Sequence, residues 1–216
     1  MKPALVIFDC DGVLVDSEPI TNAAMARDLT AHGLSISTEQ CMELFVGGTI
    51  RMVFEQATEM GANLPDDWIP CFYEQMFMEL ADKVEAIPGI HTAVTAIQQA
   101  GIATCVASNG PMRKMEVTLG RTELWDHFEG RIFSAHEVGT AKPEPGLFLH
   151  AAAAFGARPE ACVVIEDSAS GARAAEAAAM RCFGYTKDTP AEKLTRHGAR
   201  AFDDTTELPR LLELDG

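Results

Sequence analysis

Polar residues that could act together in catalysis follow four short runs of the chain. The first two, Asp9 and Asp11, come directly after the apolar run Leu5-Val6-Ile7-Phe8, and Ser108 follows a second run that ends at Ala107. The four groups are Asp9-Cys10-Asp11-Gly12-Val13, Ser108-Asn109-Gly110, Lys142-Pro143-Glu144-Pro145 and Glu166-Asp167-Ser168. Carboxylates, a hydroxyl and an ammonium group together can bind an anionic group and transfer it, as phosphoryl transfer requires.

The carboxylates of these groups predict a divalent cation. Neighbouring carboxylates repel one another and shift one another's pKa values unless a hard cation shares them. Mg²⁺ prefers oxygen ligands and binds through a few carboxylates together with a substrate phosphate, which leaves one carboxylate as a nucleophile. Lys142 and the Ser108 hydroxyl would then hold the remaining phosphoryl oxygens. The chain has neither a G-x-x-x-x-G-K-[ST] nor a G-x-G-x-x-G motif, so no nucleotide-binding loop is expected.

The elements that must position these residues alternate between apolar runs and Ala-rich amphipathic segments. The apolar runs cover residues 5–8, 103–107, 131–134, 162–165 and 181–185, and the helical segments cover residues 91–100, 111–120, 146–155 and 169–179. This alternation is typical of βαβ units in a parallel sheet. Ligands bind beyond the carboxyl ends of the strands in such sheets, so the polar groups should meet at one edge. We therefore predict an α/β fold with a Rossmann-like parallel-sheet core and helices on both faces.

A stretch of successive helical patterns interrupts this alternation after the first run. Helices are expected near residues 19–32, after a capping box of Ser37 and Gln40, over residues 49–60 and over residues 67–82. The predicted organisation is a discontinuous Rossmann-like core of residues 1–16 and 87–216 and an inserted all-α cap of residues 17–86.

Composition restricts the partners of the chain. The 216 residues include 17 Lys and Arg against 32 Asp and Glu, a formal net charge of −15 that repels a nucleic-acid backbone. No apolar run approaches the roughly 20 residues of a membrane-spanning helix, and Asp9 comes too early for a signal peptide. The six cysteines lack metal-ligand spacing and are expected to be reduced thiols. These features predict a cytoplasmic protein whose partner is a small phosphorylated metabolite, and they favour no particular oligomeric state.

The four polar groups also form an ordered set of motifs. They read Asp9-Cys10-Asp11-Gly12-Val13, Ser108-Asn109, Lys142-Pro143 and Glu166-Asp167-Ser168. In this order and spacing they resemble the motifs of the haloacid dehalogenase superfamily, and the resemblance covers the whole chain. The helical insertion resembles the C1 cap of the β-phosphoglucomutase-like group, which includes sugar-phosphate phosphatases. The run from Ser108 to Pro111, followed by Lys114, resembles bacterial phosphatases that act on sugar acid phosphates such as 6-phosphogluconate.

The resemblance implies catalytic roles for four residues. Asp9 would be the nucleophile that forms an aspartyl-phosphate, and Asp11 would protonate the leaving oxygen and then activate water. Ser108 would bind the transferring phosphoryl group, and Lys142 would neutralise its charge while orienting Asp9.

The resemblance also implies the metal ligands. Asp9 and Asp167 would bind Mg²⁺ through their carboxylates, and Asp11 would bind it through its main-chain carbonyl. Glu166 would act directly or through a bound water.

Substrate binding is expected to involve residues of both predicted domains. In the core these are Ser108, Asn109 and Lys142, although Ser108 could also cap the helix that opens at Pro111. In the cap they are Gly47, Gly48 and Arg51; Arg51 would pair with a charged or hydroxylated part of the substrate, and the alternative is an interhelical turn with a solvated arginine.

These assignments predict an enzyme that hydrolyses a small phosphomonoester, a sugar or sugar acid phosphate, with Mg²⁺ and an aspartyl-phosphate intermediate. Relatives that cleave carbon–halogen bonds lack the aspartate that matches Asp11, so its presence favours an oxygen leaving group. A sugar phosphomutase of the β-phosphoglucomutase type is the alternative within the family, but those mutases carry a histidine where this chain has Thr21. A non-catalytic phosphate-binding or regulatory module is the alternative from another class.

Overall fold

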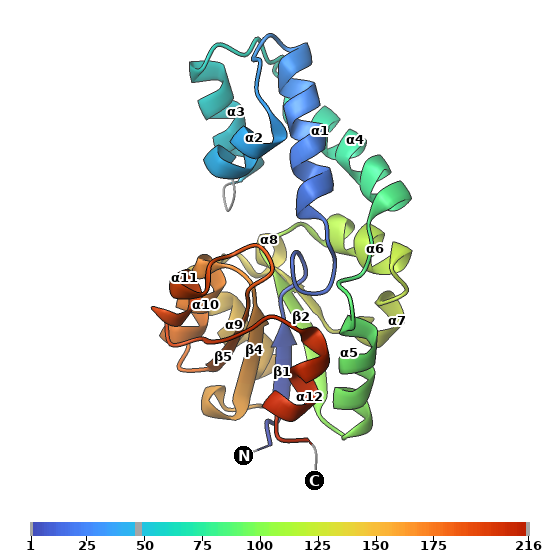
Figure 1. Cartoon of the computed structure of the whole chain (residues 1–216), viewed down its shortest axis with the longest axis vertical. Helices are drawn as coiled ribbons and strands as arrows, with labels where there is room; N and C mark the ends of the chain where they lie inside the picture. The colour runs from blue at the N-terminus through green and yellow to red at the C-terminus, as the bar shows by residue number, and fades with distance from the viewer. Residues whose placement is uncertain (1, 46–48, 215–216) are drawn as a thin grey trace. The chain divides into compact units, whose positions relative to one another are not determined.

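The computed structural model describes residues 2–45 and 49–214 of the chain (Figure 1). The contacts between residues divide the chain into two compact units, one of Met1–Asp16 with Glu85–Gly216 and one of Ser17–Val84. The first unit contains a β-sheet, and four helices make up the described part of the second.

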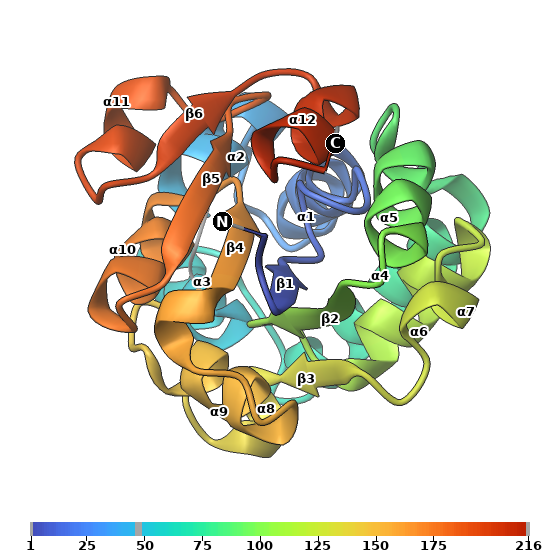
Figure 2. The ribbon, with the colours of Figure 1, turned by 90° about the horizontal axis from the view of Figure 1, so that it is seen from below.

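A six-stranded parallel sheet lies at the centre of the first unit, in the order β3-β2-β1-β4-β5-β6 (Figure 2). The strands are β1 (Leu5–Phe8), β2 (Ala103–Ser108), β3 (Ile132–Ser134), β4 (Cys162–Glu166), β5 (Arg181–Tyr185) and β6 (Arg200–Phe202). In β1, Ile7 is in register with Cys105 of β2 on one side and Val164 of β4 on the other. The chain builds outward from β1 to the β3 edge and then from β4 to the β6 edge. The strand order therefore switches at β1 and β4, where open α/β sheets bind ligands.

Helices cover both faces of this sheet, which confirms the predicted α/β fold. The helices of the first unit are α5 (Ile90–Gln99), α6 (Met112–Arg121), α7 (Trp125–Phe128), α8 (Ala135–Val138), α9 (Gly146–Ala154), α10 (Ala169–Ala177), α11 (Ala191–Thr195) and α12 (Leu208–Leu211). Figure 2 shows α9 and α10 on one face, with α5 and α12 on the other. All four residues of β1 are buried, because a strand covered on both faces is apolar throughout rather than alternating.

The main elements of the first unit lie where the sequence patterns predict them. The predicted helical segments correspond to α5, α6, α9 and α10, with bounds that differ by at most two residues. The patterns did not predict β6 or the short helices α7, α8, α11 and α12. These elements are three to five residues long, too short for a helical or strand periodicity to be recognised.

The second unit is built from α1 (Glu18–Ala31), α2 (Thr38–Phe45), α3 (Ile50–Glu59) and α4 (Trp68–Lys83). Its interior centres on Trp68, whose ring stacks on that of Phe72 with centroids 5.1 Å apart. The Trp68 indole N–H donates to the carboxylate of Asp28 on α1, which joins α4 to α1. The predicted capping box is confirmed, because Ser37 N donates to Gln40 Oε1 at 2.9 Å and Gln40 N donates to Ser37 Oγ at 3.2 Å.

Two segments of the first unit lie side by side where the chain passes to and from the helical unit. Asp16 N donates to Glu85 O at 2.9 Å, and Ile87 N donates to Leu14 O at 3.0 Å. Val15 and Ala86 form an antiparallel bridge between these bonds. The helical insertion therefore begins and ends at adjacent points of the backbone.

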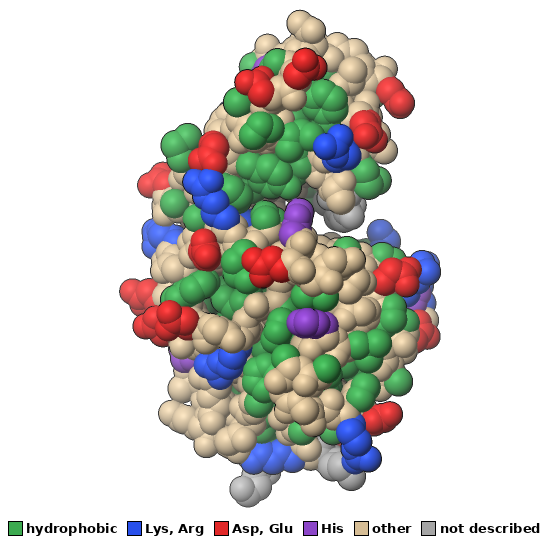
Figure 3. All heavy atoms as spheres, turned by 180° about the vertical axis from the view of Figure 1, so that it is seen from behind, with side chains coloured by type: hydrophobic (Ala, Val, Ile, Leu, Met, Phe, Trp, Pro, Cys, Tyr) green, Lys and Arg blue, Asp and Glu red, His purple; other side chains and the backbone are tan. Residues whose placement is uncertain are grey.

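The surface and the cysteines agree with the expectations from composition. In the described part of the chain no helix combines the length and the apolar character needed to cross a membrane. Acidic, basic and hydrophobic side chains are interspersed on the face shown in Figure 3. All six cysteines are free thiols, and Cys71 is the exposed one among them.

An aromatic contact in the core gives a test of the packing. The rings of Phe8 and Phe128 are both fully buried and meet edge to face with centroids 5.9 Å apart. Phe128→Ala should lower the free energy of unfolding by about 3–5 kcal/mol, because it removes buried apolar surface and leaves a cavity. Urea unfolding measures this change. Leu149→Ala on α9, where the leucine is 39% exposed, is the control, and an equally large loss in the control would contradict the packing described here.

Candidate active site

Three carboxylates meet at the carboxyl ends of the two central strands. Asp9 follows β1, Glu166 ends β4 and Asp167 follows it, and one carboxylate oxygen from each lies within 4.8 Å of the others. The main chain of Asp9 continues the ladder, since its N–H donates to Ile165 O at 2.9 Å. The sheet register thus brings together carboxylates that are far apart in the sequence.

Gly12 allows the first loop to approach Asp167 closely. Its φ of +79° lies in the left-handed region that favours glycine. A Cβ atom at Gly12 would lie 2.0 Å from Asp167 Oδ2. Any other residue would therefore displace the Asp167 carboxylate from the cluster.

The ammonium group of Lys142 lies between two of the carboxylates. Lys142 Nζ donates to Asp9 Oδ1 at 2.6 Å and to Glu166 Oε1 at 2.7 Å, and the lysine side chain is 3% exposed. The ammonium also lies 5.0 Å from the centroid of the Phe148 ring. Burial lowers the pKa of Lys142, but the charges of Asp9 and Glu166 and their hydrogen bonds outweigh it, so the pKa is raised overall. Lys142 is therefore a permanent cation in this site.

Asn109 holds the Lys142 loop against the end of β2. The main-chain N–H of Lys142 donates to Asn109 Oδ1 at 2.9 Å, and Asn109 Nδ2 donates to Lys142 O at 3.1 Å. Both polar atoms of the Asn109 side chain thus contact one peptide segment. This positioning function was missed in the sequence, where Asn109 is predicted to bind substrate, because the two segments are 33 residues apart.

Glu166 is held from its second oxygen by the start of α10. Glu166 Oε2 accepts from Ser168 N at 2.7 Å and from Ser168 Oγ at 2.8 Å. Ser168 is also the N-cap of α10, since its Oγ accepts from Gly171 N at 3.0 Å. The Glu166 carboxylate therefore has a fixed orientation, with one oxygen on Lys142 and the other on the helix cap.

The electrostatics of Asp9 show that the cluster suits a cation. The pKa of Asp9 is raised to about 7 overall: burial raises it most, the charge of Lys142 lowers it, and the charges of Glu166 and Asp11 raise it. The single buried ammonium of Lys142 thus does not neutralise all the negative charge of these carboxylates. A set of oxygen donors with excess negative charge fits a hard divalent cation such as Mg²⁺.

The side chains of Ser108 and Asp11 both lie close to Gly110. Ser108 is 2% exposed, and its Oγ accepts from Gly110 N at 3.0 Å. A Cβ atom at Gly110 would lie 3.4 Å from Ser108 Oγ and 3.6 Å from Asp11 Oδ2. The suggestion that Ser108 caps the next helix is wrong, because the N-cap of α6 is Pro111. Ser134 on β3, which the sequence did not single out, donates its hydroxyl hydrogen to Gly110 O at 2.8 Å.

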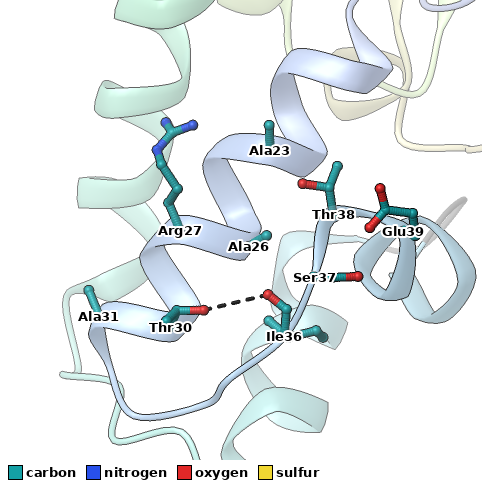
Figure 4. A pocket seen from close by; sticks show the side chains of 9 residues that line it. All are labelled: Ala23, Ala26, Arg27, Thr30, Ala31, Ile36, Ser37, Thr38 and Glu39. Atoms are coloured by element: carbon teal, nitrogen blue, oxygen red, sulfur yellow. Dashed lines mark hydrogen bonds between the residues drawn. The ribbon is translucent and has the colours of Figure 1, made fainter.

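Of the three residues predicted to bind substrate from the cap, Arg51 lies within the described part of the chain. Gly47 and Gly48 lie outside the described residues. Arg51 is exposed near the start of α3, whose N-cap is Thr49. A cavity of about 750 Å³ within this unit is lined by residues of α1, of α2 and of their connection (Figure 4): Ala23, Ala26, Arg27, Thr30, Ala31, Ile36, Ser37, Thr38 and Glu39. Arg51 is not among the residues that line it.

This arrangement of groups is suited to phosphoryl transfer. It contains a buried carboxylate that can attack phosphorus, a buried ammonium that can neutralise charge on phosphoryl oxygens, a hydroxyl group and further carboxylates that can bind a metal ion. A second carboxyl group, that of Asp11, lies near Gly110, as the Ser108 hydroxyl does, and can carry a proton.

Comparisons with known proteins agree with this chemistry. The sequence model of the family described as haloacid dehalogenase-like hydrolase matches residues 3–179. The chain is 30% identical over 213 residues to 6-phosphogluconate phosphatase of Escherichia coli (strain K12), covering 98% of this chain and 95% of that protein.

Solved structures with the same fold cover nearly the whole chain. A conserved haloacid dehalogenase-like protein of unknown function from Agrobacterium tumefaciens is 34% identical, with a TM-score of 0.83 and 98% of each chain covered. A hydrolase of this family from Deinococcus radiodurans, solved with bound phosphate and sodium, is 29% identical, with a TM-score of 0.82 and coverage of 98% of this chain and 96% of that chain.

The contact between α10 and Glu166 gives a test of how the cluster is held. A Cβ atom at Gly171 would lie 1.8 Å from Glu166 Oε1, so Gly171→Ala must displace the carboxylate and break its contacts with Lys142 and Ser168. We expect the free energy of unfolding to fall by about 1–3 kcal/mol. The matched control is Gly120→Ala, because Gly120 lies in α6 with nothing within 4 Å of its Cβ position. That variant should gain about 0.5–1 kcal/mol, and a Gly171→Ala protein as stable as the control would contradict the described packing.

Proposed function

Since the chain belongs to the haloacid dehalogenase-like hydrolase family, we propose that it is a Mg²⁺-dependent phosphatase that hydrolyses a small phosphorylated sugar or sugar acid. The observation that carries this proposal is the buried ammonium of Lys142, which contacts both Asp9 and Glu166 beside a third carboxylate. Such a group neutralises charge that develops on phosphoryl oxygens, and a merely structural ion pair would not require a third carboxylate oxygen, that of Asp167, within 4.8 Å of the other two.

The chain's own residues account for both halves of the reaction. A carboxylate oxygen of Asp9 attacks phosphorus while the bond from phosphorus to the leaving oxygen breaks, and the carboxyl group of Asp11 gives its proton to that oxygen. Water then attacks the phosphorus of the aspartyl-phosphate and passes a proton to Asp11 while the bond from phosphorus to the Asp9 oxygen breaks. This step restores both carboxyl groups and releases inorganic phosphate. Ser108 donates a hydrogen bond to a phosphoryl oxygen, and Lys142 keeps Asp9 oriented throughout.

The proposed metal site would use residues that other contacts already hold in place. Asp9, Glu166 and Asp167, with the main-chain carbonyl of Asp11, would hold Mg²⁺, which neutralises charge on the phosphoryl group when bound. Asp167 can approach the other carboxylates because Gly12 has no side chain. Lys142 provides the permanent positive charge in the same cluster.

The substrate class is inferred from the relatives. The E. coli protein that is 30% identical over 213 residues is a 6-phosphogluconate phosphatase, so its name identifies a sugar acid phosphate as the first substrate to test. The bound phosphate in the D. radiodurans structure supports a phosphate-binding site in this fold. We propose that Asn109 acts on the substrate through the Lys142 loop that it positions.

The function is tested by phosphate release from 6-phosphogluconate, glucose 6-phosphate and sorbitol 6-phosphate. Asp9→Asn should remove turnover, because an amide cannot form the aspartyl-phosphate, and Asp11→Asn should lower kcat by about 10²–10⁴-fold. Asp126→Asn makes the same change at an exposed position of α7 and serves as the control. Undiminished release by Asp9→Asn would contradict the mechanism. Conversion of a sugar 1-phosphate to its 6-phosphate, without release, would identify a mutase instead.

The metal is tested separately from turnover. EDTA should abolish phosphate release, and added Mg²⁺ should restore it. Mg²⁺ should also raise the unfolding temperature, since a ligand at 100 times its Kd stabilises the folded state by about 2.7 kcal/mol. Asp167→Asn should lose this rise because it removes one of the clustered carboxylates. An unfolding temperature that responds to Mg²⁺ equally in the wild type and the variant would contradict the proposed ligand set.

A further inference from the structure

A second lysine contacts the carboxyl group proposed to carry the proton. Lys114 Nζ lies 2.7 Å from Asp11 Oδ1, with 11% of the lysine side chain and 17% of the aspartate side chain exposed. This contact is distinct from the pairing of Lys142 with Asp9 and Glu166. The sequence motif contains Lys114, but the spacing gives no sign that it contacts Asp11, because the two residues are about one hundred positions apart.

The place of Lys114 on its helix argues for a role beyond surface charge. Lys114 is the third residue of α6, and the first turn of this helix contains no acidic residue. A cation near a helix N-terminus is destabilised by the helix dipole, typically by about 0.3–1 kcal/mol. The chain nevertheless places the ammonium there, partly buried and against the Asp11 carboxylate.

One oxygen of Asp11, Oδ1, contacts Lys114, and the other lies near Gly110. Oδ2 lies 3.6 Å from the Cβ position of Gly110, and Ser108 Oγ lies 3.4 Å from the same point, with Lys114 Cδ at 3.7 Å. Asp11 Oδ2 and the Ser108 hydroxyl, which is proposed to bind the phosphoryl group, thus both lie near Gly110.

We propose that Lys114 is a positioning residue that fixes the orientation of the Asp11 carboxyl group for proton transfer. The inference rests on the proposed phosphatase function. The terminal torsion of an aspartate is broad, so a carboxyl group without a partner samples many orientations. Proton transfer needs the donor oxygen within hydrogen-bond distance of the leaving oxygen, and a displacement of about 1 Å can cost about 10²-fold in rate. The contact with Lys114 holds Oδ1 and so directs Oδ2 towards the reacting group.

A double-mutant cycle tests this role. Lys114→Met should lower kcat/KM for sorbitol 6-phosphate by about 10–100-fold. In the Asp11→Asn background it should cause no further loss, because the group that it positions is already gone. Lys114→Arg should restore part of the activity. The control is Arg113→Met, which removes a cation from the neighbouring, exposed position of the same helical turn.

The dependence of kcat/KM on the leaving group separates loss of proton transfer from a structural defect, because a structural defect would lower kcat/KM equally for all leaving groups. The kcat/KM value reports the steps up to transfer of the phosphoryl group to Asp9. A sugar alkoxide requires a proton from Asp11 in that step, whereas p-nitrophenolate leaves without one. Lys114→Met should therefore reduce kcat/KM for sorbitol 6-phosphate far more than for p-nitrophenyl phosphate.

Other outcomes would overturn the inference. Direct binding of the substrate by Lys114 would give two different results. The losses in kcat/KM of the two single variants would multiply in the double variant, and Lys114→Met would raise KM for 6-phosphogluconate but not for the other substrates. Equal losses with both leaving groups would show a general structural effect. Lys114→Gln provides a second neutral variant if the methionine variant does not fold. If the wild type is active, Asp9→Asn abolishes turnover and Lys114→Met has no effect, the phosphatase proposal stands and the role of Lys114 is overturned. An inactive wild type would overturn both the phosphatase proposal and the role of Lys114.

Discussion

The interaction on which the site depends is the buried ion pairing of Lys142 with Asp9 and Glu166. Two carboxylates and one ammonium at contacts of 2.6 and 2.7 Å are held almost without solvent. Removing one partner of such a set leaves an uncompensated buried charge, at a typical cost of about 3–5 kcal/mol. The surrounding structure is therefore arranged to keep Lys142 in place: Asn109 binds its main chain, and Ser168 fixes the far oxygen of Glu166.

The parallel sheet brings these charged groups together without a strained backbone. The carboxyl ends of β1 and β4 are adjacent, so Asp9 and Glu166 meet without any unusual backbone between them. Close approach instead depends on two glycines. Gly12 leaves room for the Asp167 carboxylate and Gly171 leaves room for that of Glu166. The pKa of Asp9 is raised mainly because burial in this cluster leaves its carboxylate poorly solvated.

Much of this could be predicted from the sequence, because buried parallel strands are apolar throughout and their polar ends mark the site. The five longer apolar or β-rich runs and the Ser37–Gln40 capping box are local signals, and the structure contains them. The strand β6 carried no such signal, since its three residues are held mainly by pairing with β5. Contacts that join distant segments, such as Asn109 with the Lys142 loop or Lys114 with Asp11, arise only from the register of the sheet and from the placement of α6.

The bridge between Val15 and Ala86 determines where a segment can be inserted into this fold. The segments at residues 14–16 and 85–87 run antiparallel with paired backbone groups, and an antiparallel pair can be closed by a loop of two residues. A tight turn between these two segments would therefore be enough to connect them and to leave the sheet unchanged. A segment of any length that starts and ends at these paired positions can be exchanged without altering the register of β1 with β2 and β4. The inserted helical segment and the sheet that carries the site residues can therefore be changed independently of each other.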